Sequence, residues 1–256
     1  MHHYLITLSY NGTQFSGWQS QTGDLKTIQS ELLRAFRKSV KQRDVVVVGA
    51  SRTDRGVHAL DQKVKVSLLC DLQPDALQSS VNYRLHPDVK ILNCTKVSKE
   101  FNLFNSCQKK TYHYYFSNQK NEIPIHTDQV VYVSREMDIE KMKKACSTFV
   151  GEHDFRNFYS KSSQVKSTVR EITHFELSKC QFSPFLDEVM VFKVEGYGFL
   201  KHLIRYMVGT IFQVGLGYKS EDHIREYLEV EKDDKLSKKA PAHGLYLYQI
   251  ELKNHH

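Results

Sequence analysis

A short polar stretch combines a carboxylate with two guanidinium groups and lies between two apolar segments. Residues 49–59 read GASRTDRGVHA, so that Asp54 stands between Arg52 and Arg55, and the glycines around them permit a tight turn. A carboxylate on such a loop can act as a nucleophile or a base, and the arginines can bind an anion. The alternative is that the polar side chains satisfy the backbone of a turn while the arginines are solvated.

Elements of secondary structure on both sides must position this loop. The apolar run at 45–48 and the alternating run at 63–69 predict two strands that meet at it. Periodicity predicts further elements in the first half of the chain, which are strands at 4–10 and 89–97 and helices at 27–41 and 74–85. Residues 11–19 predict an ordered loop in which Phe15 and Trp18 fill part of the core.

The second half of the chain contains a basic and aromatic strand. Residues 109–116 read KKTYHYYF, which places Tyr112 and Tyr114 on one face and Lys110 just before them. Cations that hold phosphates beside a ring that stacks on a base are typical of RNA recognition. The alternative is a sheet face whose tyrosines pack beneath a helix, which is the expectation for Tyr114.

A second candidate for chemistry is an arginine on an apolar helix. Residues 196–209 read GYGFLKHLIRYMVG and predict the start of the most apolar helix of the chain. Apolar residues cover a broad arc of this helix, and His202, Arg205 and Gly209 lie on the narrow side that the arc leaves. An unpaired guanidinium in such surroundings is costly, so a carboxylate or a phosphate should meet it. Asp54 is the candidate partner. The alternatives are an ion pair with another acid and simple exposure at the edge of the buried arc.

The composition indicates a basic protein of ordinary hydrophobicity. Its 256 residues include 36 Lys and Arg against 29 Asp and Glu, and the net charge of +7 favours a polyanionic partner. Five widely spaced cysteines without a CxxC pair suit a reducing cytosol, which predicts a cytoplasmic protein. The sequence has no apolar segment long enough for a signal peptide or a membrane span. It also has no cluster of His and carboxylates that predicts a metal site.

Six separated segments resemble, in the same order, the motifs of the TruA family of tRNA pseudouridine synthases. They are NGTQFSGWQ at 11–19, SRTDRGVHA at 51–59, NYRLHPDV at 82–89, KTYHY at 110–114, GFLKHLIRYMVG at 198–209 and APAHGLYL at 240–247. The resemblance extends over 4–252. Ser51 departs from it, because the family has glycine there. Phe104 and Cys107 stand where the family has Arg and Ala, which removes one expected RNA contact.

The resemblance implies an active site. Asp54 is expected to be the nucleophile, Arg205 its ion-pair partner, and Tyr112 the ring that stacks on the target base and takes part in a proton transfer. The expected substrate-binding residues are Arg52, Arg55, Lys110, His202 and Leu245. No cofactor and no metal ion are expected, because the isomerisation of uridine neither oxidises nor hydrolyses anything.

The resemblance also implies a fold, a substrate and an assembly. The fold is α+β, with two ferredoxin-like halves, at 1–105 and 106–256, that share a largely antiparallel sheet with the catalytic cleft between them. The expected substrate is tRNA, modified at uridines 38, 39 and 40 of the anticodon stem-loop by a homodimer. The alternatives are the same chemistry at another site in tRNA or RNA, and a non-catalytic RNA-binding or RNA-folding protein on the same scaffold.

Overall fold

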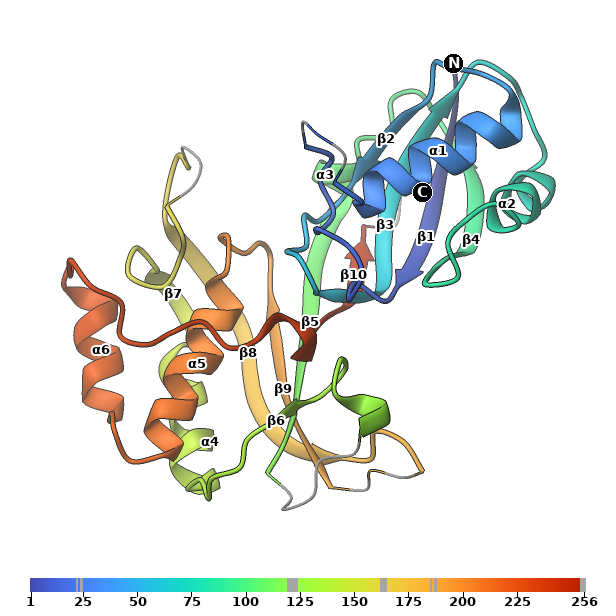
Figure 1. The fold of residues 1–256 in the computed structure, drawn as a ribbon. Helices are drawn as coiled ribbons and strands as arrows, with labels where there is room; N and C mark the ends of the chain where they lie inside the picture. Colours follow the sequence, from blue (N-terminus) through green and yellow to red (C-terminus); the bar gives the residue numbers. More distant parts are fainter. Residues whose placement is uncertain are drawn as a thin grey trace. The chain divides into compact units, whose positions relative to one another are not determined.

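The computed structural model describes residues 1–21, 23, 25–118, 124–161, 165–184, 186 and 188–253 and has a mixed α+β fold (Figure 1). The chain forms two compact units. Unit 1 contains Met1–Gln108 and Tyr246–His256, and unit 2 contains Lys109–Leu245. The strands of both units pair largely antiparallel, so the fold class predicted from the sequence is confirmed.

Unit 1 is built on a sheet in the order β4-β1-β3-β10, with β2 also paired to β3. Its strands are β1 (His2–Tyr10), β2 (Val46–Gly49), β3 (His58–Leu68), β4 (Val89–Val97) and β10 (Leu245–Leu252). Antiparallel pairing joins β1 to β3 and β4, whereas β10 runs parallel to β3 and pairs through Tyr246 and Leu247. Every second side chain of β1 from Tyr4 to Tyr10 is buried, as the alternation predicts.

Two helices of unit 1, α1 (Ile28–Val40) and α2 (Pro74–Asn82), cover one face of its sheet (Figure 1). The short α3 (Leu103–Ser106) contacts β3. A capping box starts α1, because the Thr27 hydroxyl accepts from the Ser30 N–H at 3.1 Å and the Ser30 hydroxyl accepts from the Thr27 N–H at 3.0 Å. Pro74 occupies the first turn of α2, where its missing N–H costs nothing.

The strands of unit 2 pair antiparallel in the order β5-β9-β8-β7, with the short β6 parallel to β5. Its strands are β5 (Cys107–Ser117), β6 (Val131–Tyr132), β7 (Gly151–Asp154), β8 (Val169–Cys180) and β9 (Val189–Gly196). Strands β8 and β9 form an antiparallel pair.

The helices of unit 2 are α4 (Ile139–Thr148), α5 (Leu203–Gly215) and α6 (Glu221–Glu229), with short 3-10 helices at Pro124–His126 and Ala242–Gly244. The described helices α4 and α5 contact each other, and α4 also contacts β8 and α6. Beneath them an aromatic cluster has neighbouring ring centres 5.0 to 6.1 Å apart; its members are Tyr114, Phe116, Phe192 and Phe212. This cluster fixes β5 and β9 against α5.

The helix predicted from residue 196 begins later than expected. Strand β9 continues to Gly196, and α5 starts only at Leu203. His202 precedes the helix with a left-handed φ of 66°, a conformation that cannot continue a right-handed helix. Phe199 and Leu200 fall within the helix predicted from residue 196, and this prediction was wrong for them because they lie in the connection between β9 and α5.

The segment after residue 245 lies with unit 1. By sequence we grouped 106–256 together, but Tyr246–His256 belongs to unit 1 because β10 pairs with β3. All five cysteines are free thiols. Within the described part of the chain, no helix is both long and apolar enough to cross a bilayer.

Candidate active site

Asp54 begins a tight turn between β2 and β3. The Val57 N–H donates to the Asp54 carbonyl at 3.2 Å, and Gly56 takes a left-handed φ of 76° within the turn. Glycine adopts this conformation without a steric penalty, which explains the glycine after Arg55. The Asp54 side chain is half-buried. The turn predicted for this stretch is therefore present, and it presents a partly accessible carboxylate.

Buried side chains fix the backbone that leads to Asp54. The Gln62 amide, which is fully buried, donates to the Ser51 carbonyl at 2.7 Å and accepts from the Ser51 N–H at 3.1 Å. The Tyr10 and Thr53 hydroxyls lie 2.8 Å apart in a buried hydrogen bond. A satisfied buried polar network is rigid, because breaking it leaves unpaired groups in a low dielectric. Sequence reasoning missed Gln62 and Tyr10.

The loop at 11–19 supports the Asp54 turn from a second side. The Trp18 N–H donates to the Thr53 carbonyl at 3.0 Å, and the Gly12 N–H donates to His58 Nδ1 at 3.2 Å. The Trp18 indole packs so closely on Gly49 that a Cβ there would lie 2.2 Å from the ring. Since the Trp18 side chain is only 1% exposed, its predicted role in the core is confirmed.

The arginines beside Asp54 are exposed. The Arg55 Nη2 group donates to the Ser16 hydroxyl at 3.1 Å, which ties its side chain to the 11–19 loop. Arg52 is exposed as well. Both guanidinium groups therefore lie where a polyanion can reach them.

Arg205 links α5 to the segment before β10 in unit 2. Its Nε–H donates to the Ala240 carbonyl at 2.8 Å, and its own carbonyl accepts from the Ala240 N–H at 2.8 Å. The side chain is half-buried, so it emerges from the apolar helix as predicted. Tyr114 donates to the Pro241 carbonyl at 3.0 Å. Burial raises the pKa of Tyr114 and the charge of Arg205 opposes this rise, so Tyr114 is the core residue that we expected.

The other candidate residues of unit 2 differ in exposure. Tyr112 is 6% exposed and makes an edge-to-face contact with Phe199, with ring centres 5.1 Å apart. Lys110 is half-buried near the start of β5, and Leu245 is buried at the start of β10. His202 is half-buried, and its Nδ1 atom lies 2.7 Å from the Ser160 hydroxyl.

The predicted site residues thus fall into two groups. Asp54, Arg52 and Arg55 share one loop of unit 1, and the remaining candidates, Tyr112, Lys110, His202, Arg205 and Leu245, belong to unit 2. In the residues that the structure describes, no three His, Cys, Asp or Glu side chains gather in a way that would hold a metal ion.

A methyl group on Gly12 is expected to displace the Asp54 turn. A Cβ there would lie 2.0 Å from the Val57 carbonyl oxygen, and two backbones cannot both remain in place. Gly12→Ala should therefore lower the thermal midpoint and reduce the rate of a reaction that depends on the Asp54 carboxylate by roughly 10²-fold, because a small displacement of a reacting group can cost this much. Gly198→Ala is the control, because nothing lies within 4 Å of its Cβ position. Equal effects of the two substitutions would refute the close approach.

Comparisons with known proteins identify the family of this chain. Residues 145–252 match the family described as tRNA pseudouridine synthase. The chain is 34% identical over 260 residues to tRNA pseudouridine synthase A 2 of Desulfotalea psychrophila, with 98% of this chain and 99% of the relative covered. It is 36% identical over 251 residues to tRNA pseudouridine synthase A of Francisella tularensis subsp. mediasiatica, with 98% and 94% covered. On this likeness over nearly its whole length, the chain belongs to the TruA family of tRNA pseudouridine synthases.

Proposed function

We propose that this enzyme converts uridine to pseudouridine at positions 38, 39 and 40 in the anticodon stem-loop of tRNA. As a member of its family the protein is an isomerase that acts on uridine in tRNA. The observation that carries the proposal is Asp54, a half-buried carboxylate on a turn that Gln62, Tyr10 and the 11–19 loop hold in place. A fixed carboxylate is the group that glycosidic chemistry requires.

The reaction rearranges one nucleotide. The bond between the uracil nitrogen and the ribose breaks, the base turns, and a bond forms between a ring carbon and the same sugar carbon. The proton on that ring carbon is lost and the nitrogen gains one, so that product and substrate have the same atoms. Asp54 serves as the nucleophile, and attack on either the sugar or the base satisfies this balance.

Arg205 positions the carboxylate in this proposal. Its Nε–H is bonded to the Ala240 carbonyl, which fixes the plane of the guanidinium. A guanidinium oriented in this way can bind a carboxylate with two parallel hydrogen bonds. We assign Arg205 as the ion-pair partner of Asp54.

The remaining candidates act on the RNA. The target base must leave its stem at a cost of roughly a few kcal/mol. The exposed Arg52 side chain enters the RNA and occupies the space that the base leaves. Tyr112 stacks on the extruded base and takes part in a proton transfer, with Leu245 beneath the base. Arg55, Lys110 and His202 contact the surrounding RNA. The enzyme works as a homodimer on one tRNA in the cytoplasm.

Mapping of pseudouridine tests the choice of site. Unmodified tRNA with uridines at 38, 39 and 40 is incubated with the enzyme, treated with carbodiimide and read by primer extension. Stops are expected at these three positions and should disappear one at a time when each uridine is changed to cytidine. Stops elsewhere would assign the same chemistry to another site. Tight RNA binding without any stop would favour the non-catalytic alternative.

A further inference from the structure

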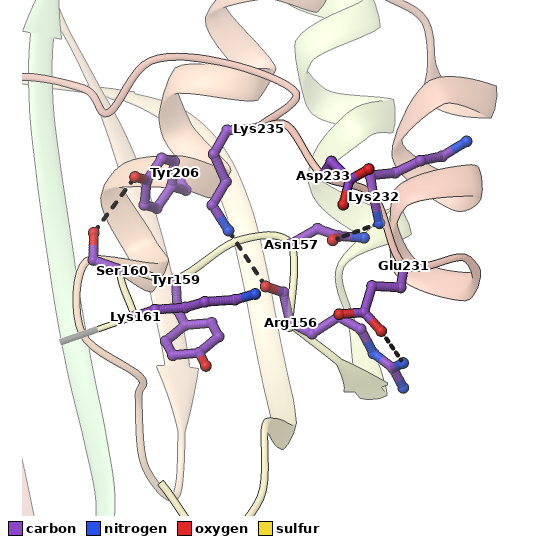
Figure 2. Close-up of a pocket in the computed structure, with 10 residues that line it drawn as sticks. All are labelled: Arg156, Asn157, Tyr159, Ser160, Lys161, Tyr206, Glu231, Lys232, Asp233 and Lys235. Atoms are coloured by element: carbon purple, nitrogen blue, oxygen red, sulfur yellow. Dashed lines mark hydrogen bonds and ion pairs between the residues drawn. The ribbon is translucent and has the colours of Figure 1, made fainter. Parts of the chain in front are cut away.

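Unit 2 contains a pocket that no step of the proposed reaction uses. Its volume is about 360 Å³, and it lies between the segment 156–161, Tyr206 of α5 and the segment 231–235 (Figure 2). We call it the Lys235 pocket; its lining residues are Arg156, Asn157, Tyr159, Ser160, Lys161, Tyr206, Glu231, Lys232, Asp233 and Lys235.

A buried asparagine ties two walls of the pocket together. Asn157 is 2% exposed, and its Nδ2 group donates to the Tyr227 and Val230 carbonyls at 2.7 Å each. Its Oδ1 atom accepts from the Lys232 N–H at 3.1 Å. Three bonds from one side chain fix the segment after α6 against the segment after β7. The backbone segments that form two walls of the Lys235 pocket are therefore held in place.

The cations of the pocket differ in how their charge is balanced. Arg156 forms ion pairs with Asp154 and with Glu231, the latter at 3.5 Å, and Lys232 forms one with Glu226. In the described part of the chain, no ion pair joins a carboxylate to Lys161 or Lys235. Figure 2 shows both lysine side chains extending toward the same part of the pocket. An excess of positive charge is therefore concentrated at these two ammonium groups.

Aromatic rings hold Lys235 at this place. Its Nζ atom lies 5.7 Å from the ring centres of both Tyr159 and Tyr206 and donates to the Arg156 carbonyl at 3.3 Å. Burial and the positive charge of Lys161 lower the pKa of Lys235. Two ammonium groups that repel each other in a half-enclosed site are stabilised when an anion binds between them.

The polar groups beside the lysines suit a phosphate. The Ser160 hydroxyl lies 3.4 Å from the Tyr206 hydroxyl and 2.7 Å from His202 Nδ1, and Lys239 Nζ lies 3.4 Å from the same Nδ1 atom. Hydroxyls and lysines together are the usual ligands of phosphodiester oxygens. Tyr206 directly follows Arg205 on α5, so the pocket adjoins a residue of the proposed active site.

We propose that the Lys235 pocket binds a phosphate group of the tRNA backbone, with Lys235 and Lys161 as its two cationic ligands. The choice of tRNA as the source of this phosphate rests on the proposed function. The site gives the enzyme a fixed contact with the RNA backbone beside the proposed active site.

Binding of labelled, unmodified tRNA to charge-removing variants tests this pocket. Lys235→Met and Lys161→Met keep most of the apolar stem and remove the ammonium group. Each should weaken binding roughly five- to tenfold near 100 mM salt, and the variant that lacks both lysines should reduce the slope of log K against log salt by about 0.7 to 0.9, the value for one phosphate. Lys232→Met is the matched control, because this lysine lines the same pocket but is paired with Glu226. It should change the affinity by less than about twofold.

Further variants and a titration with inorganic phosphate distinguish the possible results. Lys235→Arg should retain most of the affinity, and the double variant should lose less than the product of the two single losses, because both lysines serve one phosphate. Equal effects of Lys235→Met and Lys232→Met would overturn the proposal. Stabilisation of the wild type by inorganic phosphate, with normal tRNA binding by Lys235→Met, would assign the pocket to a free phosphate and also overturn it. Binding is measured without turnover, so failure to form pseudouridine at positions 38–40 would count against the proposed function and not against the pocket.

Discussion

Asp54→Asn is expected to abolish pseudouridine formation, with a loss of roughly 10⁴-fold or more in the single-turnover rate. Asparagine has the shape of aspartate but lacks the anionic oxygen that serves as the nucleophile in the proposed reaction. The turn should remain intact, because Gln62, Tyr10 and the Trp18 N–H hold neighbouring residues and not the carboxylate. Carbodiimide mapping and the kinetics of product formation measure the loss.

The control for this substitution is Asp44→Asn. Asp44 is an exposed aspartate of the same unit, and its replacement removes the same charge outside the turn. It should leave activity and tRNA affinity within about twofold of the wild type. Asp54→Asn should bind tRNA as the wild type does and melt at a similar temperature. Retained activity in Asp54→Asn would mean that the carboxylate only supports the turn.

Replacement of Arg205 should have the second largest effect. Arg205→Met is expected to lower kcat by roughly 10²- to 10³-fold, which is typical for the loss of one fixed donor to a charged catalytic group. Arg205→Lys should recover little of this, because a lysine keeps the charge but lacks both the planar fork and the Nε–H that bonds to Ala240. Single-turnover rates at saturating tRNA separate kcat from binding, which should change much less.

The contact with Ala240 requires its own control, because any Arg205 variant also loosens the connection between α5 and the segment before β10. Ser237→Ala breaks a comparable link, since the Ser237 hydroxyl lies 2.9 Å from the Thr210 hydroxyl of α5. It should reduce stability modestly and leave kcat within a few-fold of wild type. A loss of kcat in Ser237→Ala as large as that in Arg205→Met would assign Arg205 a purely structural role.

Local patterns predicted most of the secondary structure. The alternation in β1 and the periodicity of α1 describe side chains that face one core, and such patterns depend only on neighbouring residues. The start of α5 could not be obtained in this way, because Phe199 and Leu200 fit the helical wheel while the left-handed backbone of His202 excludes them. The parallel pairing of Tyr246 with His58 joins distant residues and leaves no local signal.

The candidate site residues could be predicted from the sequence, whereas the residues that support them could not. The motif around Asp54 was found directly, but its supports are tertiary contacts. Gln62 reads as an ordinary polar position on an alternating strand, and its amide is recognised as a clamp only when it meets Ser51. For Tyr112 the sequence predicted a ring that stacks on a base. It did not predict that this ring packs on Phe199, because the pattern of aromatic residues on one strand does not show contacts with other segments.

The chain enters unit 2 at residue 109 and returns to unit 1 at residue 246, which imposes an order on folding during translation. Unit 2 is continuous and can fold as soon as it leaves the ribosome, whereas the sheet of unit 1 must wait for β10. The ring of Tyr246 then stacks on His58, 4.5 Å away, and His58 accepts the bond from Gly12 beside the Asp54 turn. A nascent chain thus completes the support of its Asp54 turn only after all of unit 2 has been synthesised.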